Sequence, residues 1–313
     1  FRAPLLSFIF GKVDADVMKN SMVYFFYTVL SYPFIALYDA GASIFRAQEN
    51  TRGPMVISII SNVMNIVGNG ILIWVFHMGV AGAAISTLVS RIFCAVVVLY
   101  QLRKDRQPIV VRDYLKIRPD GKMIGRILAL GIPSGIENSM FQLGKLAIQS
   151  TVSTLGTTAI AAQAMTNMLE MLNGTAVIGV GIGLMTVVGQ SLGAGRKDEA
   201  VYYMKKLMIF SEVFLIACCA VVYVLARPIT MIGGMEAKSA EMCLDMMFWI
   251  TIVKPIVWMF AFIPAYGMRA AGDVKFSMIT SCITMWTFRF CLCVYLIRVC
   301  GMGPMAVWIG MFT

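Results

Sequence analysis

The feature that most constrains this chain is its succession of apolar segments, each long enough to cross a bilayer. Eight fall at about 18–45, 54–76, 79–102, 123–155, 159–190, 200–226, 239–267 and 274–299, a ninth begins near 303, and residues 1–10 resemble the end of an earlier one. A helix needs about 20 apolar residues to cross about 30 Å of hydrocarbon. The chain is also only 13% charged, whereas soluble domains carry about 25%. We therefore predict an all-α integral membrane protein.

Several functional classes are disfavoured by composition. The net charge of +10 is explained by basic cytoplasmic loops, so we expect no nucleic-acid partner. His77 is the only histidine and the eight cysteines show no CxxC spacing, so we expect no metal site and no cofactor. An integral membrane enzyme would need a clustered acid–base set, whereas the acidic residues here are scattered in depth, and we expect no enzyme activity.

The distribution of Lys and Arg between alternate loops predicts the orientation. One side holds 16 of these residues and the other side six. The positive-inside rule places the richer side in the cytoplasm. We therefore predict that loops 46–53, 103–126, 193–200 and 269–275 are cytoplasmic, in a multi-pass protein of a bacterial inner membrane.

An internal repeat predicts the architecture. Phe45-Arg46-Ala47 and the residues up to Ser58 align without gaps on Met268-Arg269-Ala270 and the residues up to Ser281, at an offset of 223. An even number of spans separates the copies, so the two halves should run parallel. The repeat predicts two pseudo-symmetric six-helix lobes, with about eight complete helices of twelve present and about three spans upstream of residue 1.

Domain boundaries follow from the same repeat. Residues 1–102 would form the end of helix 3 and helices 4–6 of the first lobe, and residues 123–313 helices 7–11 and the start of helix 12 of the second. The polar stretch 103–122 would be the cytoplasmic linker between the lobes.

Polar residues form stripes on three of the predicted helices, and these are our candidates for a substrate or ion pathway. They are Asn138, Gln142, Lys145 and Gln149 with Glu137 beside them, then Gln163, Asn167 and Glu170, and then Asn62 and Asn65. Polar groups inside a span usually face a cavity or a partner. The alternative is that they bond helices together.

Charged residues inside spans offer a second indication. Glu137 or Glu170 beside Lys145 would form either an ion-coupling pair, whose carboxylate pKa depends on whether the site is open, or a fixed structural pair. Arg91 and Arg289 lie mid-span in opposite halves, and we expect them to hold helices together.

Four stretches resemble the multidrug and toxic compound extrusion (MATE) family. They are Phe45–Pro54 with Asn62 and Asn65; Gly79–Thr87; Ile132–Gly135 with Gln163; and Gly189–Gly195 with Glu199-Ala200. The resemblance covers essentially the whole chain. It implies a monomeric antiporter that exports small organic, often cationic compounds through the bilayer, driven by H⁺ or Na⁺ as coupling ion.

Two departures from the family pattern leave the coupling ion open. Phe141 stands where many members carry an acidic residue on the seventh helix, and the segment Val257–Pro264 contains no acid. The first-helix aspartate of proton-coupled members would lie upstream of residue 1. A lipid-linked saccharide flippase of the same superfamily, with a more cationic cavity, is the alternative; Arg91, Lys145, Lys254 and Arg289 favour it.

Overall fold

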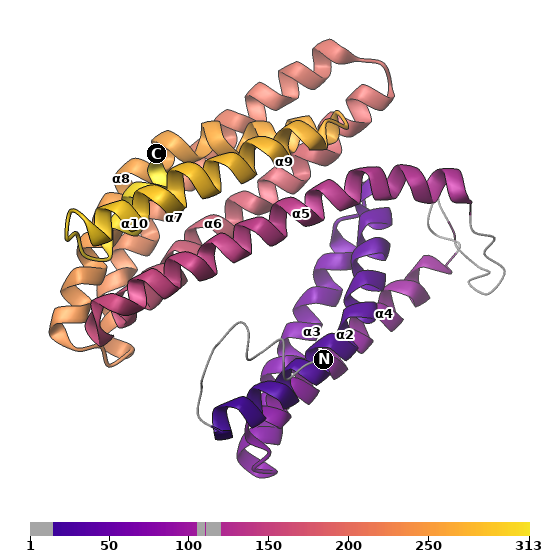
Figure 1. Ribbon diagram of the computed structural model, residues 1–313. Coiled ribbons are helices and arrows are strands. Elements are labelled where there is room, and N and C mark those ends of the chain that lie inside the picture. The colour runs from indigo at the N-terminus through magenta and orange to yellow at the C-terminus, as the bar shows by residue number, and fades with distance from the viewer. Residues whose placement is uncertain (1–14, 105–109, 111–119) are drawn as a thin grey trace. The chain divides into compact units, whose positions relative to one another are not determined.

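The computed structural model describes residues 15–104, 110 and 120–313. The chain divides into two compact units, Phe1–Arg118 and Pro119–Thr313, and each is described by itself. The division falls inside the polar stretch 103–122. Throughout the described residues the regular structure is helical (Figure 1).

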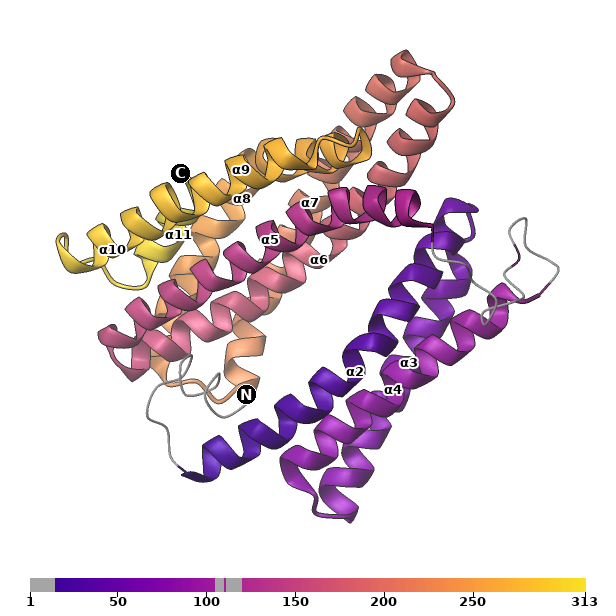
Figure 2. The same cartoon turned by 45° about the vertical axis from the view of Figure 1, so that its right-hand side comes forward.

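Unit 1 is a group of long helices packed side by side. They are α2 (Ala15–Ala47), α3 (Arg52–Gly70), which continues as the π-helical η1 (Ile71–Val75), and α4 (Gly79–Leu102). Helix α4 packs along both α2 and α3, as Figure 2 shows from a second direction. Phe45, Ile57 and Val98 lie at the centre of the contact, at most 1% exposed. Gly41 lies against the Val98 side chain, which lets α2 and α4 approach closely.

Unit 2 contains the remaining helices. They are α5 (Gly121–Val152), η2 (Ser153–Leu155), α6 (Thr157–Gly193), α7 (Lys197–Ile232), α8 (Ala237–Ala270), α9 (Val274–Ile283), the π-helical η3 (Thr284–Phe290), α10 (Cys291–Arg298) and α11 (Met305–Phe312). Helices α6, α7 and α8 pack against one another, and α5 packs along α9 and η3. Leu169, Ile250 and Trp308 are buried in the larger of the unit's two apolar clusters.

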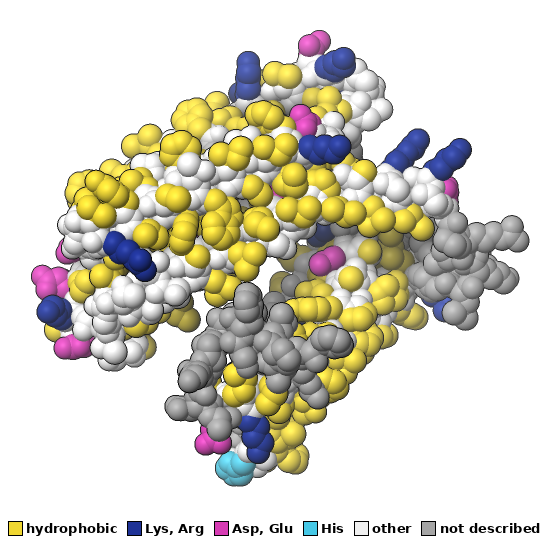
Figure 3. All heavy atoms as spheres, viewed as in Figure 1, with side chains coloured by type: hydrophobic (Ala, Val, Ile, Leu, Met, Phe, Trp, Pro, Cys, Tyr) yellow, Lys and Arg dark blue, Asp and Glu magenta, His cyan; other side chains and the backbone are white. Residues whose placement is uncertain are grey.

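Seven helices of the described residues have the length and apolar composition needed to cross a membrane. They coincide with seven of the eight complete predicted spans. The eighth, α5, has 32 residues, but it is not among the seven because it carries the polar stripe and many glycines. Hydrophobic side chains cover the sides of the helices in both units (Figure 3), as expected for helices that meet lipid.

The internal repeat is also visible in the hydrogen bonds that end two helices. Helix α2 ends with Glu49 at φ +62°, and α8 ends with Gly272 at φ +87°, 223 residues later. In both places the left-handed residue donates its N–H three residues back, to Arg46 or Arg269, and the following residue donates five residues back. This is the Schellman motif. The matching residues therefore adopt the same turn.

The start of the next helix repeats as well. The Asn50 side chain accepts a 3.3 Å hydrogen bond from the Gly53 N–H, and the Asp273 side chain accepts one of 3.3 Å from the Phe276 N–H. Both pairs are related by the offset of 223. Asp273 is the N-cap of α9, and Asn50 immediately precedes Thr51, the N-cap residue of α3. Both side chains satisfy helix donors that otherwise have no partner, which explains why Asn or Asp is present at both positions.

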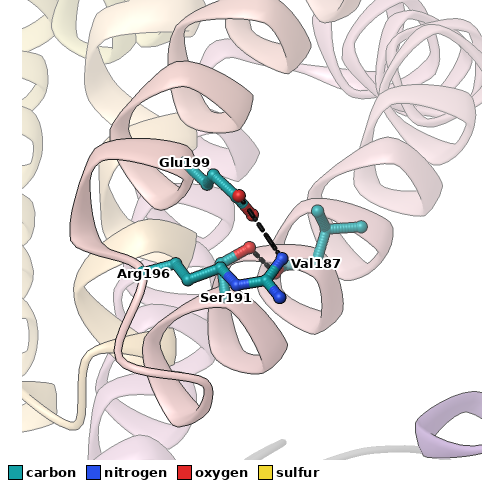
Figure 4. Close-up of polar contacts among 4 residues, drawn as sticks. All are labelled: Val187, Ser191, Arg196 and Glu199. Atoms are coloured by element: carbon teal, nitrogen blue, oxygen red, sulfur yellow. Dashed lines mark hydrogen bonds and ion pairs between the residues drawn. The ribbon is translucent and has the colours of Figure 1, made fainter.

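A similar turn joins α6 to α7. Gly195 adopts φ +77°, and the Arg196 N–H donates to the Ser191 carbonyl over 2.9 Å. Figure 4 shows the Arg196 guanidinium reaching Glu199 over 3.4 Å, one turn into α7, and the Ser191 hydroxyl donating to the Val187 carbonyl. Both charged side chains are well exposed, so this pair contributes little stability.

Candidate functional site

An ion pair crosses from α6 to α8 in the interior of unit 2. Lys254 of α8 is completely buried, and its Nζ lies 2.6 Å from Glu170 Oε1 and 3.4 Å from the Glu170 carbonyl oxygen. Small residues on α6 make room for α8: a Cβ on Gly174 would lie 3.8 Å from the lysine Nζ, and Gly181 lies against the Tyr266 ring. The pair therefore depends on the close approach of these two helices.

A second group of charges lies where α5 meets η3. Lys145 Nζ is 5.0 Å from the centroid of the Phe141 ring, and the Arg289 guanidinium carbon is 5.4 Å from the same centroid. Gly144 permits this contact, because a Cβ there would collide with the side chain of Met285, one turn before Arg289. Two cations thus share one aromatic ring.

The two groups belong to one electrostatic cluster. Glu170 interacts electrostatically with both Lys145 and Arg289, and Lys145 is also repelled by Lys254. The cluster holds three cations around one carboxylate. It extends from the completely buried Lys254 to Lys145, which is exposed on unit 2, and charged side chains within membrane helices are expensive.

A third polar network joins α5 to α8 and α9. Arg269 Nη2 lies 2.8 Å from Glu137 Oε1, which also accepts hydrogen bonds from Ser281 over 2.9 Å and Ser277 over 3.4 Å. Glu137 is 8% exposed. Its second oxygen, Oε2, is buried without a hydrogen-bond partner among the described residues.

These contacts correct one sequence-based expectation. We expected Glu137 or Glu170 to pair with Lys145, whereas the ion pairs of the described residues join Glu170 to Lys254 and Glu137 to Arg269. The reason is geometric. Each carboxylate reaches a cation of the packed helix α8, whereas Lys145 contacts Phe141 of its own helix and is otherwise exposed.

The predicted stripe of α5 is displayed on the surface of unit 2. Asn138, Gln142 and Lys145 are exposed and Gln149 is half-buried. The Asn138 amide donates to the Ser134 carbonyl within the same helix, so it does not join helices there.

Some residues of the polar stripe on α6 are buried and others are exposed. Gln163 is 2% exposed and donates to Asn167 over 3.3 Å. Asn167 is exposed, and Glu170 lies further along the same helix. The α6 stripe therefore runs from a buried amide to the charged cluster.

In unit 1 the polar residues join helices. Asn65 of α3 donates to Thr87 of α4 over 3.3 Å and accepts from Asn69, whereas Asn62 is exposed. Arg91 of α4 donates to the buried Ser31 of α2 over 2.5 Å. This is the geometry expected of polar contacts that hold membrane helices together. Arg289 contacts a second helix through Phe141 instead.

Sequence reasoning missed Arg269, Ser277 and Ser281 as members of the Glu137 network. The two serines are one helical turn apart on α9, a spacing that places them on one face. That spacing was the available signal. Asn173, completely buried with both amide atoms unpartnered among the described residues, was also missed.

Comparison with known proteins identifies the family. The MatE family model matches residues 133–295, just over half of the chain and most of unit 2. The chain belongs to the MATE family. A second family model, that of the lipid II flippase MurJ, matches residues 3–118, which lie in unit 1.

Relatives of this MATE chain extend over most of its length. The probable multidrug resistance protein NorM of Thermotoga maritima is 23% identical over 97% of the chain, which spans 66% of that protein. The probable multidrug resistance protein YoeA of Bacillus subtilis is 25% identical over 89% of the chain, which spans 61% of that protein. The chain therefore spans less than two thirds of the length of these curated relatives.

Solved structures share the fold of this MATE chain. An outward-facing multidrug resistance MATE transporter superposes with a TM-score of 0.88 at 17% identity, covering 99% of this chain and 70% of that one. A MOP superfamily transporter from Pyrococcus furiosus, whose reverse polarity of the binding pocket suggests a different function, gives the same TM-score and identity over 99% and 69%. At this identity the likeness shows the fold, a polytopic helical transporter fold.

Proposed function

We propose that the intact protein is a monomeric secondary transporter of a bacterial inner membrane, which exports small organic compounds in exchange for H⁺ or Na⁺. The observation that carries this proposal is a set of two ion pairs between the helices of a MATE-family fold, Glu170 with Lys254 and Glu137 with Arg269. Ion pairs between packed membrane helices are a costly means of stabilisation. A transport role explains why they are present, and relatives named as probable multidrug resistance proteins support an exporter.

Glu137 is our candidate for the coupling carboxylate. Its Oε1 atom is held by Arg269 and two serines, while Oε2 is buried and has no partner among the described residues. A proton or Na⁺ bound at Oε2 would weaken the attraction to Arg269. Because Arg269 is on α8 and the serines are on α9, loss of this attraction would release α5 from both helices.

The polar face of α5 is our candidate for the pathway. Asn138, Gln142 and Lys145 are exposed on unit 2, and such a face is unfavourable against hydrocarbon. In this account the loops at 46–53, 103–126, 193–200 and 269–275 face the cytoplasm, as the excess of Lys and Arg predicts.

A flippase for lipid-linked saccharides is the second candidate. The MurJ match over residues 3–118 and the excess of cations in the unit 2 cluster favour it. The likeness to the Pyrococcus furiosus transporter of reverse polarity is consistent with a cargo other than a cationic drug.

Drug susceptibility in a pump-deficient bacterium separates the two candidates. Expression of the full-length protein should raise resistance to several dyes or antibiotics and lower their accumulation in energised cells. Unchanged resistance to every compound, with the protein present in the membrane, would favour the flippase.

A further inference from the structure

The charge balance of the cluster in unit 2 indicates which cargo the site can accept. Three cations, Lys145, Lys254 and Arg289, surround the single carboxylate of Glu170, and Glu170 already pairs with Lys254. We propose that Lys145 and Arg289, which both contact the ring of Phe141, bind the anionic group of an amphipathic organic anion. This proposal rests on the proposed transport function and specifies the charge of its cargo.

Lys145 and Arg289 share a single counter-charge that is already engaged. Among the carboxylates of the described residues, Glu170 is the one that acts electrostatically on both cations, and it pairs with Lys254. A contact with an aromatic face stabilises a cation. This contact does not neutralise the cation, so the three cations and one carboxylate of the cluster keep an excess of two positive charges.

Both cations keep hydrogen-bonding capacity for a ligand. The Lys145 side chain is exposed and Arg289 is half-buried, and the Nε of Arg289 has no hydrogen-bond partner among the described residues. An ammonium and a planar guanidinium together match a carboxylate, sulfonate or phosphate group, which accepts several charge-assisted hydrogen bonds.

An aromatic ring next to the cations fits an apolar part of the cargo. Phe141 contacts both cations, with its ring centroid 5.0 Å from Lys145 Nζ and 5.4 Å from the Arg289 guanidinium carbon, so a ligand whose anionic group reaches them meets an aromatic ring. Exposed Gln142 is adjacent on the same helix. A hydrophilic anion would leave this ring unused, whereas an amphipathic or aromatic anion would bury it.

A cationic drug is disfavoured at the same position. It would add a further positive charge to a group that already contains three, in surroundings where charges are poorly screened. The expectation of an often cationic cargo came from family resemblance, and the side chains of this chain favour the opposite charge.

The test compares two dyes with the same xanthene core and opposite charge. Fluorescein, an anion, and rhodamine 123, a cation, are titrated against the purified full-length protein by fluorescence anisotropy. We expect fluorescein to bind at least about tenfold more tightly than rhodamine 123, since hydrogen bonds to charged groups contribute about 1.5–3 kcal/mol. Equal or tighter binding of rhodamine 123 would overturn the proposal.

Variants locate the site. Lys145→Gln and Arg289→Gln should each weaken fluorescein binding about tenfold, and Lys145→Arg should restore it to within about threefold because the charge is kept. Lys197→Gln, at an exposed position of the α6–α7 turn, is the matched control and should change nothing. Lys145 is exposed, so its loss should leave the protein folded, which size-exclusion chromatography checks. Unchanged fluorescein affinity in a folded Lys145→Gln protein would contradict the assignment.

Soluble compounds and lipid headgroups both carry such anionic groups, and competitors distinguish these sources. Displacement of fluorescein by hexyl phosphate identifies a soluble organic anion, and displacement by phosphatidic acid alone identifies a headgroup. Displacement by neither would contradict the proposal. Export of rhodamine 123 by a protein that does not bind fluorescein would refute the anion site but not the transport function. Charge-selective binding without any transport would refute the transport function but not the anion site.

Discussion

Lys254 of α8 places its Nζ 2.6 Å from Glu170 Oε1 of α6, and the lysine side chain is completely buried. The partners are 84 residues apart, so the contact exists only when the two long helices pack together. It supplies the single negative charge of a cluster that is otherwise cationic. The pair therefore connects the packing of unit 2 with the charge that its cargo would meet.

Breaking this pair on one side should destabilise unit 2 more than removing it altogether. Glu170→Gln leaves a buried ammonium without its counter-charge, at a cost of about 3–5 kcal/mol. The double variant Glu170→Gln/Lys254→Met removes both charges and should recover much of that loss. Thermal unfolding in detergent measures the difference. A double variant less stable than Glu170→Gln would show that the pair is a net source of stability.

Glu137→Gln should abolish gradient-driven efflux while expression and monodispersity are retained, because the amide cannot bind a proton or attract Arg269 as a carboxylate does. The loss of transport should be at least about tenfold, since a charge-assisted hydrogen bond contributes about 1.5–3 kcal/mol. Glu199→Gln removes the exposed partner of Arg196 and is the matched control, expected to transport normally. Efflux at the full rate in Glu137→Gln would exclude Glu137 from coupling.

Water should reach the polar face of α5. In a protein whose accessible native cysteines are replaced, Gln142→Cys should react with a water-soluble thiol reagent, and Gln149→Cys, which is half-buried, should react more slowly. Val224, 72% exposed on α7, provides the lipid-facing control. Labelling of both glutamine positions no faster than of Val224→Cys would show that this face does not line a pathway.

Gly272→Ala should destabilise the protein by about 1–2 kcal/mol, because an L-residue in the left-handed region is strained. A Cβ there would meet no atom within 4 Å, so the cost would come from the backbone alone. Gly125→Ala, also uncrowded but inside α5, should instead stabilise by about 0.5–1 kcal/mol. Equal effects on thermal unfolding would contradict the assigned turn.

The sequence was most informative about helices and turns, because these depend on residues that are close together in the chain. Apolar run length and turn residues located the helices to within a few residues. Asn50 and Asp273 accept the same hydrogen bond at the start of a helix in the two copies, because such a bond needs only its own helix. The repeat at an offset of 223 was visible for the same reason. Glu49, in a left-handed position that glycine fills at Gly272, would not have been predicted from residue type.

The ion pairs were harder to predict because they depend on how helices rotate against one another. Helical spacing placed Glu137 and Lys145 near one face of α5, but it said nothing about which face α8 presents. The absence of a side chain at Gly144 decides one such contact, since a Cβ there would collide with Met285. Its importance became apparent only when the partner helix was known.

Transport by the reconstituted full-length protein tests the central claim most directly. Dye movement across proteoliposomes is followed while an inward H⁺ or Na⁺ gradient is imposed and then collapsed with an ionophore. We expect dye movement against its own gradient that stops when the driving gradient collapses and that is absent in Glu137→Gln. Dye movement that is indifferent to both ion gradients and to Glu137→Gln would contradict ion-coupled transport.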